Sequence, residues 1–282
     1  WDKLIHCAWN TAEPGIIFID RIHDYSPDGV YNEFKAISTN PCGEIPMGPY
    51  DSCRLIHLNL TSFVNNPYTS KASINFDLLY EISYKAMRLS DDLVDLEIES
   101  IDKIIAKIID GEDQKELKLW EQIKTSAISG RRTGLGFTGL ADVFAMMGYK
   151  YGDTESLILL KSIMYNMMLG QLDSTIDMAV IRGAFDGCDY QKEYPIDADG
   201  QDFTHGNKFY EKLWYEFPEQ TERMRQYGRR NVSWSTVAPT GTVSLMTQTS
   251  SGIEPVFLPY YQRRRKCSSP NDRVDYIDNV GE

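Results

Sequence analysis

A thiol, an amide and a carboxylate lie close together in one short segment of the chain. Residues 39–44 read Thr-Asn-Pro-Cys-Gly-Glu, so Cys42 lies between Asn40 and Glu44. A proline and a glycine flank the thiol, and they favour a tight turn over the interior of a helix or strand. Residues two apart in an extended segment point to the same side, so the three side chains can face one pocket. A redox group, a hydrogen-bonding amide and a general base would meet there.

A second thiol, Cys53, follows in the segment 50–53, which reads Tyr-Asp-Ser-Cys. Taken alone, each of these residues also has a plainer interpretation. A free cysteine is most often a small buried apolar residue, and asparagine before proline is common in turns. A lone glutamate is most often a surface residue. Residue types and spacing therefore leave a structural turn and a reactive turn both open.

A hydroxyl-rich segment is the second candidate site. It consists of Pro239, Thr240, Gly241, Thr242, Val243 and Ser244. If a helix begins here, its free N–H groups and its dipole would favour a bound phosphate. Clusters of serine and threonine also mark ordinary helix starts, where a hydroxyl caps the first turn. The local sequence does not choose between the two interpretations.

These segments resemble ribonucleotide reductase large subunits, most closely the adenosylcobalamin-dependent class II enzymes. The segment 39–44 resembles the finger loop of that family, and 238–244 resembles its phosphate-binding loop. Three further segments match in family order, namely 13–20 before the finger loop, 132–142 in the middle of the catalytic barrel, and 250–255 after the phosphate loop. Ordered matches that run nearly from end to end are far more specific than the finger-loop segment alone.

The resemblance implies a role for each candidate residue. Cys42 would carry a transient thiyl radical that removes the 3′ hydrogen of a ribonucleotide. Glu44 would take the 3′-hydroxyl proton, and Asn40 would bind ribose hydroxyls. Cys53 would be one half of the redox-active disulfide, whose other half lies before the finger loop in the family and has no match in this chain. The loop near 238–244 would bind the substrate phosphate, and no metal ligand is implied.

The fold implied is a ten-stranded α/β barrel of two five-stranded halves, with a finger loop near 38–54 threaded through its centre. Residues 1–282 would be the C-terminal portion of that barrel and supply much of its second half. The resemblance further implies adenosylcobalamin as the radical source, an external dithiol reductant such as thioredoxin, and a ribonucleoside di- or triphosphate substrate. It also allows a homodimer.

Three alternatives remain open beside this interpretation. The chain could belong to a class I large subunit, which depends on a separate radical-generating small subunit. It could be a non-autonomous fragment that acts only with a complementary chain, the missing N-terminal half of the barrel; the absence of a starting methionine fits this interpretation. It could also be a nucleotide sensor that binds without turnover.

Composition narrows the classes of protein further. The net charge of −12 argues against a general binder of nucleic acid or of an anionic membrane. No apolar run approaches the length that spans a bilayer. Five cysteines without a Cys-x-x-Cys pair do not indicate a zinc site or a secreted disulfide framework, so we expect a reducing cytoplasm.

Helices are expected to alternate with short apolar strands, which favours an α/β fold. The expected helices are 1–12, 75–99, 101–126 with a break near Gly111, 154–182 and 207–227. The apolar runs 16–19, 57–60 and 236–238 are expected as strands, the first as a buried strand or helix edge. The glycines of 134–139 indicate close packing of a strand against a helix, because the arginines before them are atypical of a dinucleotide-binding strand.

Several conspicuous side chains receive a structural interpretation. Asp91, Asp92 and Asp95 are expected on the polar face of a helix. The methionine pairs 146–147 and 167–168 are expected in the core. The basic run 263–266 is expected in a solvated loop, and Tyr260 and Tyr261 are expected to pack against the fold.

Overall fold

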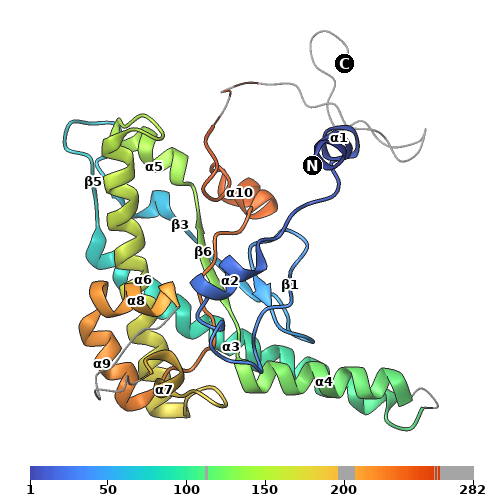
Figure 1. Cartoon of the computed structure of the whole chain (residues 1–282). Coiled ribbons are helices and arrows are strands. Elements are labelled where there is room, and N and C mark those ends of the chain that lie inside the picture. The colour runs from blue at the N-terminus through green and yellow to red at the C-terminus, as the bar shows by residue number, and fades with distance from the viewer. Residues whose placement is uncertain (112–113, 196–206, 257, 259, 261–282) are drawn as a thin grey trace.

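The computed structural model describes the chain except for residues 112–113, 196–206, 257, 259 and 261–282 (Figure 1). The elements in chain order are α1 (Asp2–Thr11), α2 (Ile19–Tyr25), β1 (Ser38–Thr39), β2 (Pro46–Met47), β3 (Leu55–Asn59), the 3-10 helix η1 (Leu60–Phe63), β4 (Val64–Asn65), β5 (Ser73–Ile74), α3 (Phe76–Ile108), α4 (Gln114–Gly130), β6 (Gly134–Thr138), α5 (Leu140–Met147), α6 (Thr154–Arg182), α7 (Tyr190–Glu193), α8 (Lys208–Glu216), α9 (Pro218–Tyr227) and α10 (Gly241–Thr247).

A parallel strand pair forms the centre of the described structure. β3 pairs with β6 in a register that runs from Leu55 opposite Gly134 to Asn59 opposite Thr138. Ser235 extends the pair through a parallel bridge to Leu135. Every residue of β6 is buried, as expected for a strand covered on both faces. The described strands form three two-stranded sheets and do not close a barrel, so they support an α/β fold without the expected ten strands.

Two long helices, α3 and α6, pack along each other and cover the strand pair on one side (Figure 1). Leu79, Met87 and Val94 recur at helical spacing and face the core from α3. Gly170 of α6 allows the close approach, because a Cβ there would lie 2.5 Å from the backbone oxygen of Tyr80. These contacts form a rigid wall behind the strands that carry the candidate site.

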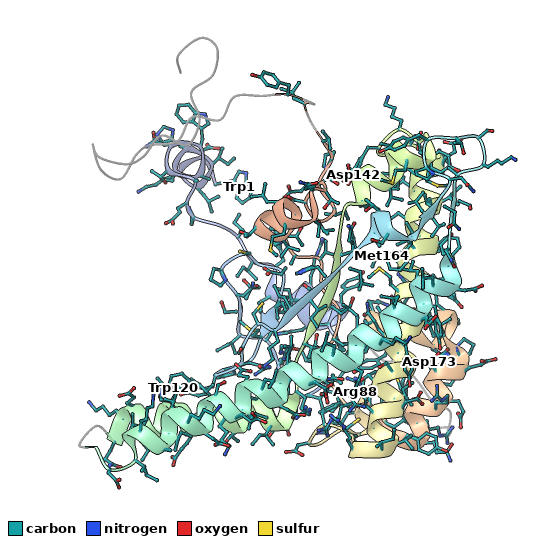
Figure 2. All side chains as sticks on the ribbon, turned by 180° about the vertical axis from the view of Figure 1, so that it is seen from behind. Trp1, Arg88, Trp120, Asp142, Met164 and Asp173 are labelled. Carbon is teal, nitrogen blue, oxygen red and sulfur yellow. The ribbon has the colours of Figure 1, made fainter. Side chains whose placement is uncertain are left out.

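The N-terminal helix α1, unlike α3 and α6, does not pack into the core. α1 has no buried residue, and Trp1 and Trp9 are 77% and 80% exposed. In Figure 2, Trp1 lies far from the helices that carry Arg88 and Asp173, and Trp120 lies on the projecting α4. No helix among the described residues is long and apolar enough to cross a membrane.

Most of the expected helices are confirmed. The helices over 1–12 and 154–182 end within a residue or two of their expected limits. The break near Gly111 is confirmed, although α3 continues unbroken to Ile108. The helix expected over 207–227 is two helices, because Pro218 lacks the N–H that would continue α8 and instead begins α9.

Two expected strands are wrong. Residues 16–18 form no strand and are 45–65% exposed; the alternative of a helix edge is confirmed only at the end of the run, where α2 begins at Ile19. Residues 236–238 form no strand either, although the neighbouring Ser235 makes an isolated bridge. The strand expected over 57–60 is confirmed for residues 57–59 as part of β3, and Leu60 begins η1 instead.

The interpretation of Asp91 as part of a polar helix face is also wrong. Its side chain is fully buried, whereas those of Asp92 and Asp95 are 42% and 47% exposed. Arg131 Nε and Asn231 Nδ2 donate to Asp91 Oδ1 at 2.7 and 3.0 Å. Arg230 Nε donates to Oδ2 at 3.4 Å, so both carboxylate oxygens are paired.

The remaining structural expectations have mixed outcomes. Met167 lies in the core, and Met147 and Met168 are half-buried against it. Tyr260 is 76% exposed, so its expected packing is wrong. The basic run 263–266 and Tyr261 lie outside the described residues.

Candidate active site

The segment 38–47 folds as a hairpin with the candidate thiol at its tip. β1 and β2 pair antiparallel, with Ser38 opposite Met47 and Thr39 opposite Pro46. The N–H of Gly43 donates to the backbone oxygen of Asn40 at 3.0 Å and closes the turn. Gly43 has a φ of +86°, a conformation that favours glycine. Cys42 is therefore presented on an exposed, tightly closed loop.

Asn40 is buried and braces this loop. Its Oδ1 accepts from the N–H of Ile45 at 2.9 Å, which ties the two sides of the turn together. Its Nδ2 donates to Cys53 Sγ at 3.8 Å, a weak contact that brings the second thiol to the base of the loop. Of the predicted residues, Asn40 and Cys53 are thus in direct contact, whereas Cys42 is exposed at the turn.

The two residues next to Cys53 in the chain, Ser52 and Arg54, both contact Glu97 of α3. Ser52 Oγ donates to Glu97 Oε1 at 2.8 Å, and Arg54 Nε pairs with the other oxygen of Glu97. Arg54 also donates to the backbone oxygen of Arg132 at 2.8 Å, next to the start of β6. This network fixes the sulfur against α3 and the central strands.

Burial raises the pKa of the Cys53 thiol to about 11. Burial is the largest cause of this rise in pKa; the nearby Glu44 and Cys42 side chains contribute to it, and the positive charge of Arg54 opposes it. Cys53 is therefore a protonated thiol at neutral pH and a poor nucleophile.

Glu44 is half-buried and lies within electrostatic range of both Cys53 and His57. Thr236 Oγ1 donates to the backbone oxygen of Glu44 at 2.9 Å, which joins the hairpin to the segment that follows Ser235. The carboxylate oxygen Oε2 is buried without a hydrogen-bond partner among the described residues. An unpaired buried oxygen of this kind is available to a substrate.

His57 is a polar residue at the site that the sequence did not single out. Its Nε2 is also buried without a partner among the described residues, and burial lowers its pKa while Glu44 opposes that effect. A lone histidine in a strand carries no spacing signal, so only its three-dimensional position reveals it.

The hydroxyl-rich segment begins a short helix, as both of its interpretations require. α10 begins at Gly241, after Thr240 in a left-handed conformation. Thr240 Oγ1 accepts from the N–H of Gly252 at 2.7 Å, and Ser244 Oγ lies 2.8 Å from Ser251 Oγ. These two hydroxyls hold the loop together, whereas Gly241, Thr242 and Val243 are exposed.

The segment 250–255 anchors this loop to the carboxyl end of β6. Gly139 N–H and Thr138 Oγ1 donate to the backbone oxygen of Ser250 at 2.9 and 2.8 Å. The N–H of Ser250 donates to Asp142 Oδ2 at 2.6 Å, and Figure 2 shows Asp142 close to this end of the strand. The hairpin and the hydroxyl-rich loop are thus both held by the segment that runs beside β6.

A cleft of about 1110 Å³ adjoins the hairpin. It is lined by Thr39, Gly43 and Pro46 of the hairpin, by Ser233 and Ser235, by Met168 and Phe209, and by Ile16, Ile17, Phe18, Arg21, Ile22, Asp24, Tyr25, Ser26 and Pro27. The exposed apolar residues 16–18 therefore form one wall of a space beside the hairpin. This position accounts for an apolar run that lies outside the core.

The sequence model of the family described as "Ribonucleotide reductase, barrel domain" matches residues 1–276. The vitamin B12-dependent ribonucleoside-diphosphate reductase of Thermoplasma acidophilum is 31% identical over 257 residues, which cover 91% of this chain and 26% of that protein. The ribonucleoside-diphosphate reductase large subunit of Plasmodium falciparum is 26% identical over 270 residues, covering 94% of this chain and 30% of that protein.

A solved structure shows a related fold. The class Id ribonucleotide reductase alpha subunit of Actinobacillus ureae matches with a TM-score of 0.52 at 18% identity, over 90% of this chain and 39% of that one. The chain thus spans about a quarter to a third of the relatives' length. Because the family model matches almost every residue, the chain belongs to the ribonucleotide reductase barrel-domain family.

Proposed function

We propose that this chain is the part of a ribonucleotide reductase barrel that carries the radical-bearing cysteine, and that it acts in the reduction of ribonucleotides to deoxyribonucleotides, the precursors of DNA. One observation carries the proposal. The hairpin brings Asn40, Glu44 and Cys42 into range of Cys53, and Thr236 ties that hairpin to the segment leading into the hydroxyl-rich loop.

Each side chain has a definite part in the reaction. A thiyl radical at Cys42 takes the 3′ hydrogen atom, and Glu44 accepts the proton of the 3′ hydroxyl. The 2′ hydroxyl then leaves as water with a proton from a thiol. Cys53 and its partner thiol supply two electrons and two hydrogens, one as the proton that leaves in the water and one as the hydrogen added to the 2′ carbon, and become a disulfide. Glu44 returns the proton to the 3′ oxygen, and Cys42 returns its hydrogen atom to the 3′ carbon. The protonated state of Cys53 supports its role as a hydrogen donor.

We propose that the first turn of α10 binds the substrate phosphate. Its leading residues, Gly241, Thr242 and Val243, are exposed, and the first N–H groups of a helix have no partner within the helix. Thr240 and Ser244 support the loop from within, so their contribution is to its shape. The negatively charged protein must attract the phosphate locally, through backbone N–H groups, because its net charge of −12 repels anions.

Adenosylcobalamin is the proposed radical source. Relatives from Thermoplasma acidophilum and Mycobacterium tuberculosis are named vitamin B12-dependent ribonucleoside-diphosphate reductases. When bound, the cofactor would supply the one-electron chemistry that converts a thiol into a thiyl radical. The exposure of Cys42 supports this, because a cofactor held elsewhere in the enzyme could reach it. The class I alternative, with a radical-generating small subunit, also requires Cys42 to be accessible to the radical source.

We further propose that the site is completed outside the described residues. Among the described cysteines, Cys7 lies in α1 and Cys188 lies beside Tyr31 and Phe185, so neither is placed as the redox partner of Cys53. Exposed apolar residues such as Trp9 and Phe18 suit contact with another part of the barrel. A complementary half-barrel, a homodimer, an external dithiol such as thioredoxin and a reducing cytoplasm belong to this proposal.

Turnover of the assembled enzyme tests the function. Adenosylcobalamin, a dithiol and a ribonucleoside diphosphate or triphosphate are supplied, and deoxynucleotide formation is measured with and without a radical-generating subunit. We expect the Cys42→Ser variant to lose turnover and retain nucleotide binding, because Cys42 is exposed and supports no described packing. Nucleotide binding by the wild-type enzyme without turnover in any arm would contradict the proposal and favour a sensor.

A further inference from the structure

We infer that His57 is a positioning residue for Glu44, and that the two side chains hold one hydroxyl-bearing molecule between them. In the free enzyme that molecule is water, and in the complex it is a sugar hydroxyl. The inference rests on the proposed function, because it assigns to His57 the task of orienting the carboxylate that accepts the 3′-hydroxyl proton.

The position of the His57 ring is fixed by its strand. Leu58 is buried in the core, so its neighbour His57 points to the opposite side of β3. His57 pairs with Gly136 of β6, where a Cβ would lie 3.1 Å from the ring carbon Cδ2 and 3.4 Å from Nε2. The missing side chain of Gly136 therefore leaves the space that the imidazole occupies.

Two buried polar atoms at this place lack partners. Neither Nε2 of His57 nor Oε2 of Glu44 has a hydrogen bond within the described part of the chain. Thr236 brings the two residues together, because its Oγ1 donates to the backbone oxygen of Glu44 at 2.9 Å, and a Cβ at Gly136 would lie 2.7 Å from its backbone oxygen and 3.1 Å from the His57 ring. The side chains of His57 and Glu44 form no direct ion pair within the described part of the chain, although the carboxylate acts on the pKa of the ring. Burying both atoms unpaired is unfavourable, and a water-sized molecule with hydroxyl hydrogens can satisfy both at once.

The charge state of the ring suits this task. Burial lowers the pKa of His57, and the carboxylate of Glu44 opposes that change. Glu44 is the charged group among the described residues that acts on the pKa of the ring, and Gly136 and Thr236, which lie beside it, do not titrate. A neutral imidazole has one N–H donor and one acceptor nitrogen, so it can either donate to or accept from a hydroxyl.

If the role of His57 were purely structural, the volume of its side chain would matter and its polar atom would not. It would fill space over Gly136, and a ring of similar size would replace it without effect on the reaction. The unpaired Nε2 and the electrostatic coupling to Glu44 instead make the polar atom the important part of the side chain. The test must therefore distinguish the effect of the polar atom Nε2 from the effect of the side-chain volume.

The first arm of the test is a histidine titration by NMR on the assembled enzyme, comparing wild type with Glu44→Gln. Removing the carboxylate charge should lower the pKa of His57 further, because Glu44 raises it in the wild type. Adding a ribonucleoside diphosphate should shift the His57 resonance, because the bridging water is exchanged for a sugar hydroxyl. An unchanged His57 titration in Glu44→Gln would overturn the inference.

The second arm uses two variants of His57. Phenylalanine keeps most of the volume and removes the polar atom, so His57→Phe should lower kcat roughly tenfold to a hundredfold and move the acid limb of the pH–rate profile. Glutamine keeps an amide N–H, so His57→Gln should restore the profile toward wild type. Equal kcat values and profiles for wild type and His57→Phe would also overturn the inference.

The two arms separate this inference from the proposed function. If the wild-type enzyme shows no turnover in any assay, the function is wrong, and the NMR titration still decides whether His57 and Glu44 are coupled. If His57→Phe fails to fold, the Glu44→Gln titration decides the matter without altering His57.

Discussion

Two carboxylates in this molecule, one fully buried and one half-buried, have opposite surroundings. Asp91 in α3 is fully buried and has both oxygens paired with Arg131, Arg230 and Asn231. Glu44 in the hairpin has a buried oxygen with no partner among the described residues. A fully paired carboxylate contributes to the fold, and an unpaired one is free to accept a proton or a hydrogen bond from a ligand. The comparison separates a structural acid from the one proposed to react.

The largest expected effect is on the reaction. Replacing Glu44 with glutamine should lower kcat by about 10²–10⁴, because the general base is lost. The unfolding free energy should change by less than about 1 kcal/mol, since no described side-chain hydrogen bond of Oε2 is broken. Turnover and denaturant titration measure the two quantities. Glu33→Gln, at an exposed glutamate, is the control and should change neither.

Asp91 should respond in the opposite way. Asp91→Ala leaves buried cationic and amide groups without their acceptor and should cost about 3–5 kcal/mol of unfolding free energy. Asp92→Ala is the matched control one residue away, because its side chain is 42% exposed and its ion pairs should contribute at most about 1 kcal/mol. Equal losses in the two variants, measured in denaturant, would remove the distinction between the sites.

The smallest effect concerns the two thiols. Cys42 is exposed, whereas burial raises the pKa of Cys53 to about 11. Because the thiolate is the reacting form, alkylation of Cys53 should keep accelerating up to about pH 11. Mass spectrometry of alkylated peptides reports each cysteine separately. In denaturant the rate should instead level off near the ordinary thiol pKa of about 8.5. The same levelling in the folded protein would contradict the assignment.

Local signals in the sequence were enough for the long helices. The 154–182 helix has Asp153 immediately before it, and that side chain caps it by accepting from the N–H of Ser156 at 2.8 Å. The turn around Cys42 likewise follows from a proline and a glycine that flank the thiol. Such features depend on neighbours in the chain, so the sequence contains them directly.

Features set by distant contacts were not predictable in the same way. The helical spacing placed Asp91 on a polar face, but its burial depends on Arg131 and Asn231, which lie far along the chain. The apolar run 16–18 has the composition of a buried strand, although it lines a cleft. His57 had no local signal, because its importance arises from Glu44 and from a glycine on the neighbouring strand.

The hydrogen bond from Thr236 to the backbone of Glu44 has a consequence for the order of events in catalysis. Thr236 is only a few residues before the loop proposed to receive the phosphate, so a displacement of that loop would also shift the peptide of Glu44, the proposed base. Binding of the nucleotide phosphate and alignment of the Glu44 carboxylate would then be coupled. A sugar lacking its phosphate would meet a poorly aimed carboxylate even when it enters the cleft.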